Sequence, residues 1–382
     1  MKKTWITVAG VVFAIGVVFF VLKNKSTQSV IPVSPESGPV RVEEGVSSPK
    51  MSESDQKADI EIVVQNLEIP WEIAFLPSGE MLVTERPGRL QKIGQNKTVI
   101  EVSGVRHVGE GGLLGLALHP DFAYNQLIYL YLTSSDNGQT VNRVERYRLE
   151  GNTLTNREVI LEGIKGASNH DGGRIKFGPD GYLYVTTGDA QEPNSAQDTN
   201  SLNGKILRIT PEGGIPSDNP YGTAVYSYGH RNVQGIAWDS GGRLWATEHG
   251  RSGVQSGLDE LNLIESGKNY GWPEIQGDET QSGMVRPIIH SGASETWAPS
   301  GAEFFEGSIF FAGLRGETLY QAKLSEGSVS ILVKHFQNQY GRLRTVKLGT
   351  DGYLYVLTNN RDGRGQVNPG DDKIIRFKTS LF

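Results

Sequence analysis

The sequence contains no cysteine. This absence excludes disulfide bonds, thiolate nucleophiles, cysteine-ligated zinc and a lipid-modified N-terminal cysteine. The sequence also lacks a basic stripe, because its 37 lysines and arginines are scattered among 43 acidic residues, for a formal net charge of −6. Nucleic-acid binding requires clustered positive charge, so we expect no nucleic-acid partner.

Long apolar runs are absent except near the N-terminus, where every residue from Trp5 to Leu22 is apolar or small and two lysines stand close to each end. This length is at the short end for a membrane span, and no small-x-small cleavage site clearly follows it. We therefore expect residues 1–25 to be a membrane anchor, with a cleaved signal segment as the alternative. Either reading predicts an extracytoplasmic protein, tethered in the periplasm or at the cell surface, or secreted if cleaved.

The next segment, residues 26–57, is rich in Ser, Pro, Glu and Val and has no hydrophobic periodicity, which predicts a disordered linker. The whole chain has 48 glycines and 17 prolines, many at turn-like dipeptides between short apolar runs. This pattern is typical of many short strands with little helix. We assign residues 58–382 to one all-β domain.

Within this domain, a turn followed by an apolar strand recurs six times. The copies begin at Gly79, Asn125, Gly181, Gly242, Gly307 and Gly352. A second strand follows each copy, and the step between copies ranges from 45 residues (Ile309 to Leu354) to 65 residues (Leu244 to Ile309). Such a step is long enough for four strands. The repeat predicts a six-bladed β-propeller with four-stranded antiparallel blades, in preference to an open β sandwich.

The first strand of the domain, Asp59 to Val64, has no partner nearby in the sequence. Because a propeller ring must close, we expect this strand to pair with the last one, Asp372 to Phe377. Six blades then use nearly all of residues 58–382 and leave no room for a second domain.

Loops at one end of a propeller channel converge, so their polar residues are the candidates for chemistry. His170 lies between Asn169 and Asp171 and precedes two glycines, which allow the backbone and a ligand to approach closely. Histidine titrates near neutral pH, and a neutral imidazole can accept a proton from a hydroxyl group. His170 is therefore a candidate general base, and the alternative is a histidine that only hydrogen-bonds its own loop.

Arginines in two other loops indicate an anionic ligand. Arg231 and Asn232 together offer donors for carboxylate or carbonyl oxygens, although such a pair can also be a structural loop contact. Arg342 and Arg344 alternate at the start of a predicted strand, so both side chains point to one face. Two like charges on one face are unfavourable without an anion.

Hard oxygen ligands are present at Asp259 and Glu260, near the glycine-rich stretch that includes Gly250. Carboxylates and backbone carbonyls are the ligands that calcium prefers. The spacing does not match an EF-hand loop, so solvated carboxylates are the alternative to a calcium site.

Eight motifs occur in order across the domain: Pro70-Trp71-Glu-Ile-Ala-Phe-Leu-Pro, Gly111-Gly-Leu-Leu-Gly, His170-Asp-Gly-Gly-Arg, Gly229-His-Arg-Asn-Val-Gln-Gly, Asp259-Glu-Leu-Asn-Leu-Ile, Lys268-Asn-Tyr-Gly-Trp-Pro, Ala298-Pro-Ser-Gly and Arg342-Leu-Arg. With them, the chain resembles the soluble quinoprotein glucose dehydrogenases, specifically their aldose sugar dehydrogenase branch. The resemblance implies a six-bladed propeller that binds pyrroloquinoline quinone (PQQ), a tricarboxylate, together with Ca²⁺. It also implies oxidation of the C1 hydroxyl of aldose sugars to lactones, with hydride transfer to PQQ.

The same resemblance implies roles for individual residues. His170 is expected to take the proton from the C1 hydroxyl, and Arg231 to stabilise the charge that develops on the quinone oxygen. Contacts with PQQ are implied for Glu110, Arg231, Asn232, Arg315, Arg342 and Arg344. Calcium contacts are implied for the carbonyls of Gly250 and Arg251 at the active site, and for Glu260 and the carbonyl of Tyr270 at a structural site.

Some positions depart from the family pattern. Glu110 replaces a glutamine, Arg251 replaces a proline, Arg315 replaces a lysine, and residues 252–257 are inserted. These departures leave open a second function, a non-enzymatic propeller that binds a sugar, a glycan or a protein. The sequence predicts neither the electron acceptor nor whether the protein is a monomer or a homodimer.

Overall fold

The computed structural model describes residues 40–45, 59–253 and 256–382 of the chain. The predicted anchor and most of the predicted linker lie outside the described residues. Among the described helices, none is long and apolar enough to cross a membrane. The described part is almost entirely β: it contains one four-residue helix, α2 (Phe122–Asn125), and short 3-10 segments at Pro193–Ala196 and Thr379–Leu381.

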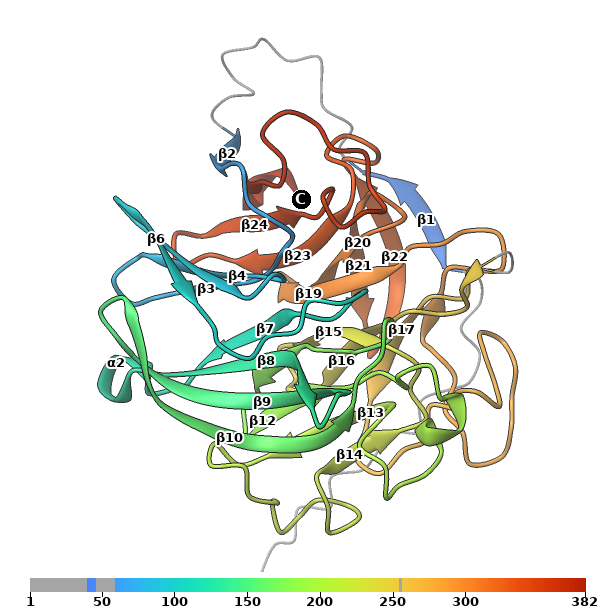
Figure 1. The fold of residues 1–382 in the computed structure, drawn as a ribbon. Coiled ribbons are helices and arrows are strands. Elements are labelled where there is room, and N and C mark those ends of the chain that lie inside the picture. Colours follow the sequence, from blue (N-terminus) through green and yellow to red (C-terminus); the bar gives the residue numbers. More distant parts are fainter. Residues whose placement is uncertain (1–39, 46–58, 254–255) are drawn as a thin grey trace, which may run out of the picture. The chain divides into compact units, whose positions relative to one another are not determined.

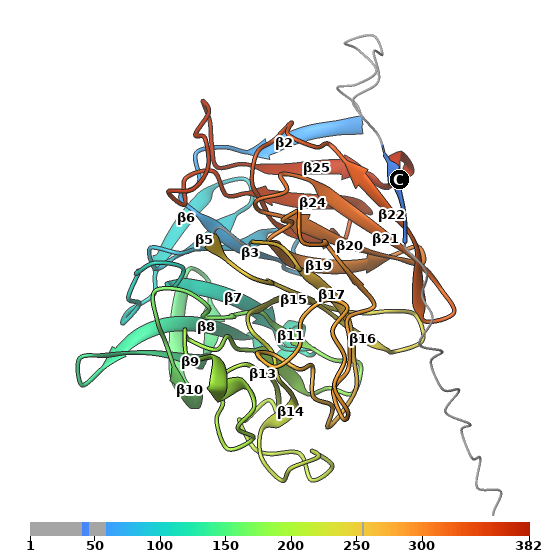
Figure 2. The same ribbon diagram turned by 90° about the vertical axis from the view of Figure 1, so that its right-hand side faces the viewer.

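The strands form six sheets, which are the blades of the predicted propeller (Figures 1 and 2). The first two blades contain β3 (Pro70–Phe75), β4 (Met81–Glu85), β5 (Arg89–Ile93) and β6 (Lys97–Glu101), then β7 (Leu113–Leu118), β8 (Leu127–Asp136), β9 (Gln139–Glu150) and β10 (Thr153–Lys165). The next two contain β11 (Ile175–Phe177), β12 (Leu183–Thr186), β13 (Lys205–Ile209) and β14 (Val225–Tyr228), then β15 (Val233–Trp238), β16 (Leu244–Glu248), β17 (Glu260–Ile264) and β18 (Ile289–His290). The last two contain β19 (Pro299–Phe305), β20 (Ser308–Gly313), β21 (Leu319–Ser325) and β22 (Ser328–His335), then β23 (Leu343–Leu348), β24 (Tyr353–Thr358), β25 (Ile374–Lys378) and β2 (Ile60–Val64).

The ring closes as the sequence predicts. Strand β2 pairs antiparallel with β25, and Ile60 lies opposite Phe377. The N-terminal strand of the domain therefore completes the blade that the C-terminal strand belongs to. Each of the six predicted strand pairs is also present, for example β12 with β13 and β24 with β25.

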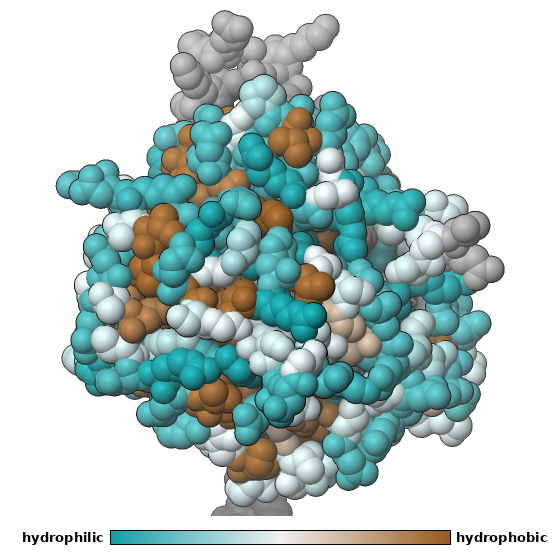
Figure 3. All heavy atoms as spheres, in the orientation of Figure 1, coloured by the Kyte–Doolittle hydropathy of each residue, from teal (hydrophilic) through white to brown (hydrophobic). Residues whose placement is uncertain are grey.

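Apolar clusters between neighbouring blades form the core. One cluster joins Trp71 of the first blade with Leu114 of the second and Val185 of the third. The same hydrogen bond between a strand and its preceding turn occurs in two blades. The hydroxyl of Tyr184 donates to Asp180 (2.9 Å), and that of Tyr355 donates to Asp351 (2.9 Å). The outer surface in Figure 3 is mainly hydrophilic, with hydrophobic groups in separate small patches.

One blade carries an additional strand. β1 (Arg41–Glu44) pairs in parallel with the edge strand β22, and Arg41 lies opposite Ile331. Val40 packs against the apolar cluster of this blade. β1 lies inside residues 26–57, so this part of the predicted disordered linker contains a strand. The four residues of β1 have no alternation of apolar and polar side chains that would predict a strand. The strand forms because it pairs with β22, almost 300 positions away.

Removing β1 is expected to lower stability without unfolding the propeller, because β22 remains paired with β21 on its other side. The loss includes the hydrogen bond from Gly45 N to Lys334 O (2.7 Å) and the packing of Val40. At about 1 kcal/mol for a hydrogen bond, we expect a chain that begins at residue 46 to melt roughly 2–4 °C below one that begins at Ser37. Equal melting temperatures in calorimetry would contradict a net stabilising role for β1.

Candidate active site

A cavity of about 450 Å³ lies where the loops of the blades converge. Its wall is formed by the segments before β7, β11, β15, β19 and β23 and by the longer β16–β17 and β24–β25 connections. Residues that are far apart in the sequence therefore meet here. Nearby, Arg174 ties the inner strands together: it forms a buried ion pair with Glu72, donates to Gln234 O (2.8 Å) and lies 3.9 Å from the ring of Trp71.

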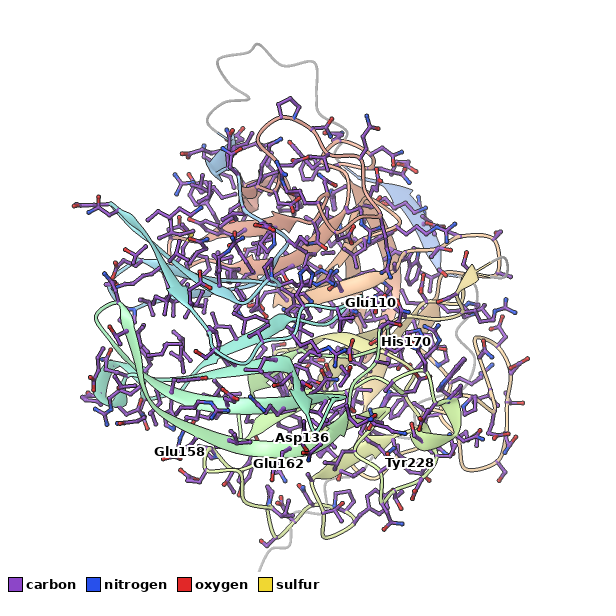
Figure 4. All side chains as sticks on the ribbon, viewed as in Figure 1. Glu110, Asp136, Glu158, Glu162, His170 and Tyr228 are labelled. Carbon is purple, nitrogen blue, oxygen red and sulfur yellow. The ribbon has the colours of Figure 1, made fainter. Side chains whose placement is uncertain are left out.

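His170 lies on the wall of the cavity, beside Glu110 (Figure 4). Its backbone has φ +64°, an unusual left-handed conformation for a residue with a side chain. The close packing behind it requires glycine, because a Cβ at Gly188 would lie 1.9 Å from the carbonyl oxygen of His170. The backbone N–H of His170 donates to Glu110 Oε2 (3.1 Å). These contacts fix the direction of the imidazole.

A buried carboxylate orients the imidazole ring. Nδ1 of His170 lies 2.7 Å from Oδ1 of Asp189, which also accepts the backbone N–H of Gln191 (2.8 Å). The other oxygen of Asp189 accepts Nε1–H of Trp272 (2.9 Å). Asp189 can therefore hold the proton on Nδ1, which leaves Nε2 of His170 as a proton acceptor. Sequence reasoning did not identify Asp189, although its place directly after Thr-Thr-Gly at the end of β12 was a usable signal.

The predicted arginines contribute to the cavity in different ways. Arg231 donates to Ser252 Oγ (2.8 Å) and lies 5.3 Å from the ring of Trp272, and its buried Nε has no hydrogen-bond partner within the described residues. Asn232 does not line the cavity. Its Oδ1 accepts the N–H of Gly172 (3.0 Å), while its buried Nδ2 is also without a partner in the described part.

Arg342 and Arg344 both line the cavity, as their alternation predicts. Arg342 has an internal anion, because its Nη2 lies 2.8 Å from Asp362. Arg344 is bonded only to neutral groups, among them Gln234 Oε1 (2.6 Å) and Asn359 Oδ1 (3.0 Å). Burial lowers the pKa of Arg344 to about 9, so its charge is poorly solvated. This cation is the one that an anionic ligand would stabilise most.

Three further residues complete the wall. Arg315 is exposed at its edge and donates to Ser256 Oγ (3.1 Å). His249, which sequence reasoning did not select, has a buried Nε2 without a partner in the described residues, and burial lowers its pKa to about 3. Burial alone would raise the pKa of Glu110, but the nearby His249 and Arg364 and the N–H of His170 outweigh this and lower it to about 2. Glu110 is therefore an anion inside a cationic cavity.

The residues with implied calcium contacts fall into two groups. Gly250 and Arg251 line the cavity, where the N–H of Gly250 donates to Asp259 Oδ1 (2.8 Å). Gly257 lies next to Arg251, since Arg251 N donates to Gly257 O (2.9 Å). No cluster of three or more metal-binding side chains of His, Asp or Glu is found in the described ranges. Calcium at the cavity would therefore depend mainly on backbone oxygens.

Glu260, which is half-buried, belongs to a pair of carboxylates with the buried Glu248, away from the cavity wall. It lies opposite Glu248 across β16 and β17, and burial together with the charge of Glu248 raises its pKa to about 8. Tyr270 stacks on His230, whose Nδ1 lies 2.9 Å from Glu248. Oxygen atoms of two nearby amides, Asn262 and Gln276, are buried without partners in the described part of the chain. This set of oxygen donors fits a hard divalent cation.

Comparisons of this chain with known proteins agree with the family that its sequence motifs resemble. A model of the Glucose / Sorbosone dehydrogenase family matches residues 67–374. The solved structure of the PQQ-bound form of an aldose sugar dehydrogenase from Streptomyces coelicolor is 40% identical, and the similarity covers 84% of this chain and 97% of that one with a TM-score of 0.78. The aldose sugar dehydrogenase YliI of Escherichia coli is 33% identical over 80% of this chain and 91% of its own length. The quinoprotein glucose dehydrogenase B of Acinetobacter calcoaceticus is 35% identical over 62% of this chain and 57% of its own length.

The fold and the cavity define a six-bladed propeller with an arginine-lined cavity whose wall carries a histidine paired with a buried carboxylate. The chain belongs to the Glucose / Sorbosone dehydrogenase family. It is an oxidoreductase of this sugar dehydrogenase family, as its sequence motifs indicate.

Proposed function

We propose that this protein oxidises the C1 hydroxyl of aldose sugars to lactones, with PQQ bound in the arginine-lined cavity and His170 as the general base. The observation that carries the proposal is the pairing of His170 with the buried Asp189 at the wall of a cavity rich in arginine. An oriented imidazole and an excess of positive charge are what this chemistry requires of the protein.

The residues fit a quinone with three carboxylates. Within the described residues, the guanidinium groups of Arg231 and Arg344 bond to no carboxylate, and the buried Nε of Arg231 and Nε2 of His249 have no hydrogen-bond partner. Arg231, Arg315, Arg342 and Arg344 would hold the anion, while Asn232 would support the loop behind it. When bound, PQQ supplies the acceptor for the two electrons and the hydrogen that leave the sugar C1.

The part played by the protein in the reaction is proton removal and charge stabilisation. Nε2 of His170 accepts the proton of the C1 hydroxyl as the C1–H bond breaks, so that the C1–O bond becomes a carbonyl. Asp189 stabilises the imidazolium that forms, through the Nδ1–H bond. Arg231, which is buried on the cavity wall, offers positive charge that would stabilise a developing anion.

The proposal is tested by reconstituting the full chain with Ca²⁺ and PQQ and measuring dye reduction with several aldoses. Turnover that requires both the sugar and the quinone is expected. Tight quinone binding without turnover on any aldose would favour a binding protein over an enzyme.

We also propose that residues 1–25 hold the protein at an extracytoplasmic membrane face, which the apolar run from Trp5 to Leu22 supports.

Calcium is expected to stabilise the protein through the carboxylates of Glu248 and Glu260. Saturating Ca²⁺ at about 100 times its Kd would add about 2.7 kcal/mol to the free energy of unfolding. We expect a chelator to lower the melting temperature, and Glu260→Gln to abolish the calcium-dependent gain because it removes a charged ligand. Glu326→Gln, at an exposed turn, is the matched control and should keep the gain. An unchanged calcium response in Glu260→Gln would place the site elsewhere.

A further inference from the structure

The connection between β24 and β25 contributes Arg364 to the wall of the cavity. Its Arg364 donates from Nη1 to Glu110 Oε1 (2.7 Å) and from Nη2 to Asn169 Oδ1 (2.9 Å). These partners lie 254 and 195 positions away in the sequence. Glu110 accepts the backbone N–H of His170 and lies beside it (Figure 4), and Asn169 directly precedes His170 in the sequence. One guanidinium therefore joins the two neighbours of the proposed base.

The connection that carries Arg364 is firmly held. The N–H of Arg364 donates to Asp362 Oδ1 (2.9 Å), and Asp362 in turn pairs with Arg342 on the cavity wall. Farther along, Asp371 accepts the side chain of Asn360 (3.0 Å) and the N–H of Asn368 (2.8 Å). The planar guanidinium of Arg364 can therefore donate to Glu110 and to Asn169 at the same time.

The charge of Glu110 explains why such a contact is needed. Its side chain is 16% exposed, it faces the cavity, and its second oxygen accepts the N–H of His170. An uncompensated carboxylate at this position would repel an anionic ligand and would favour the protonated form of a nearby imidazole. The other charged or titratable groups around this point are His249, whose protonated form also favours the Glu110 anion, and Asp189, Arg231, Arg86 and the buried Asp171.

We propose that Arg364 is a positioning residue of the active site, which neutralises Glu110 and holds the Asn169–His170 segment so that the cavity binds its anion and His170 stays an acceptor. The Glu110–Arg364 pair thus places a carboxylate on the wall without loss of the positive character of the cavity. This inference rests on the proposed function.

A double-mutant cycle tests the proposal with Arg364→Gln, Glu110→Gln and the double variant. Arg364→Gln should weaken PQQ binding about tenfold, because it leaves a carboxylate unpaired. Equilibrium titration measures this affinity. Arg364→Gln should also shift the acid limb of the pH–rate profile to higher pH by roughly one unit. The double variant should return both quantities to within about threefold of the wild type, since it removes the charge together with its partner.

Thermal unfolding without quinone gives a second measurement. Arg364→Gln should lower the melting temperature in the Glu110 background and have a much smaller effect in the Glu110→Gln background. Arg376→Gln, which breaks an exposed ion pair with Glu61 away from the cavity, is the control for simple loss of a surface arginine. It should leave quinone affinity and the rate profile unchanged.

The outcomes separate this inference from the proposed function. A wild-type protein that binds no PQQ would contradict the proposed function, while the thermal cycle would still measure the coupling of Glu110 with Arg364. Wild-type affinity and rate profile in Arg364→Gln would overturn the inference. A double variant as impaired as Arg364→Gln would also overturn it, because Arg364 would then act on the ligand directly.

Discussion

Replacing His170 by Asn should lower turnover with an aldose by about 10²- to 10⁴-fold, or about 3–5 kcal/mol in the activation barrier. The reason is that C1 cannot release its hydrogen readily until its hydroxyl begins to lose a proton. Asn is the variant of choice because residue 170 has φ +64°, and Asn tolerates this left-handed conformation better than Ala. The change removes the proton acceptor without straining the loop.

Binding and stability should change little in His170→Asn, since Arg231 and Arg344 remain in place. The acid limb of the rate profile should disappear, because the group whose protonation stops the reaction is gone. His119→Asn is a matched control: His119 also accepts a hydrogen bond in its own loop, from the N–H of Asp121 (3.0 Å). Near wild-type turnover with an intact acid limb in His170→Asn would mean that another residue is the base.

Asp189→Asn should reduce turnover by a similar factor, about 10²- to 10⁴-fold, by a different route. Its side-chain oxygen can still accept Nε1–H of Trp272, so the amide NH₂ would face Nδ1 of His170. That nitrogen must then accept a hydrogen bond, and the imidazole proton moves to Nε2. The base would be present but in the wrong tautomer, as in catalytic triads whose aspartate is replaced.

The measurement for Asp189→Asn is kcat together with quinone affinity, and only kcat should fall strongly. Asp198→Asn provides the control in the same β12–β13 connection, because Asp198 is exposed and bonds only to its neighbour Asn200 (2.9 and 3.1 Å). A loss in Asp189→Asn that is confined to melting temperature, with kcat kept in the folded fraction, would assign Asp189 a purely structural role.

Part of the site could be predicted because its residues belong to short patterns. His170 was selected for its loop position and following glycines, and Arg342 and Arg344 were expected to share one face; the structure places all three on the cavity wall, while their roles stay predictions. Asn232 shows the limit of such reasoning. It is adjacent to Arg231, yet its side chain turns behind the wall to hold Gly172. Adjacent residues in an extended segment point to opposite sides, and the sequence does not state which side faces the ligand.

The sequence by itself determined the six repeats, the strand pairs within them and the closure of the ring by β2 and β25. These features are local or periodic, because alternation of apolar residues and turn glycines acts over a few positions. The tertiary structure alone decided which side chains meet: Asp189 with His170, Arg364 with Glu110, and β1 with β22. Such contacts join loops or edges of different repeats, where hydrogen-bond geometry rather than periodicity selects the partner. The fold could therefore be predicted from the sequence, whereas the network that orients the base required the three-dimensional arrangement of the loops.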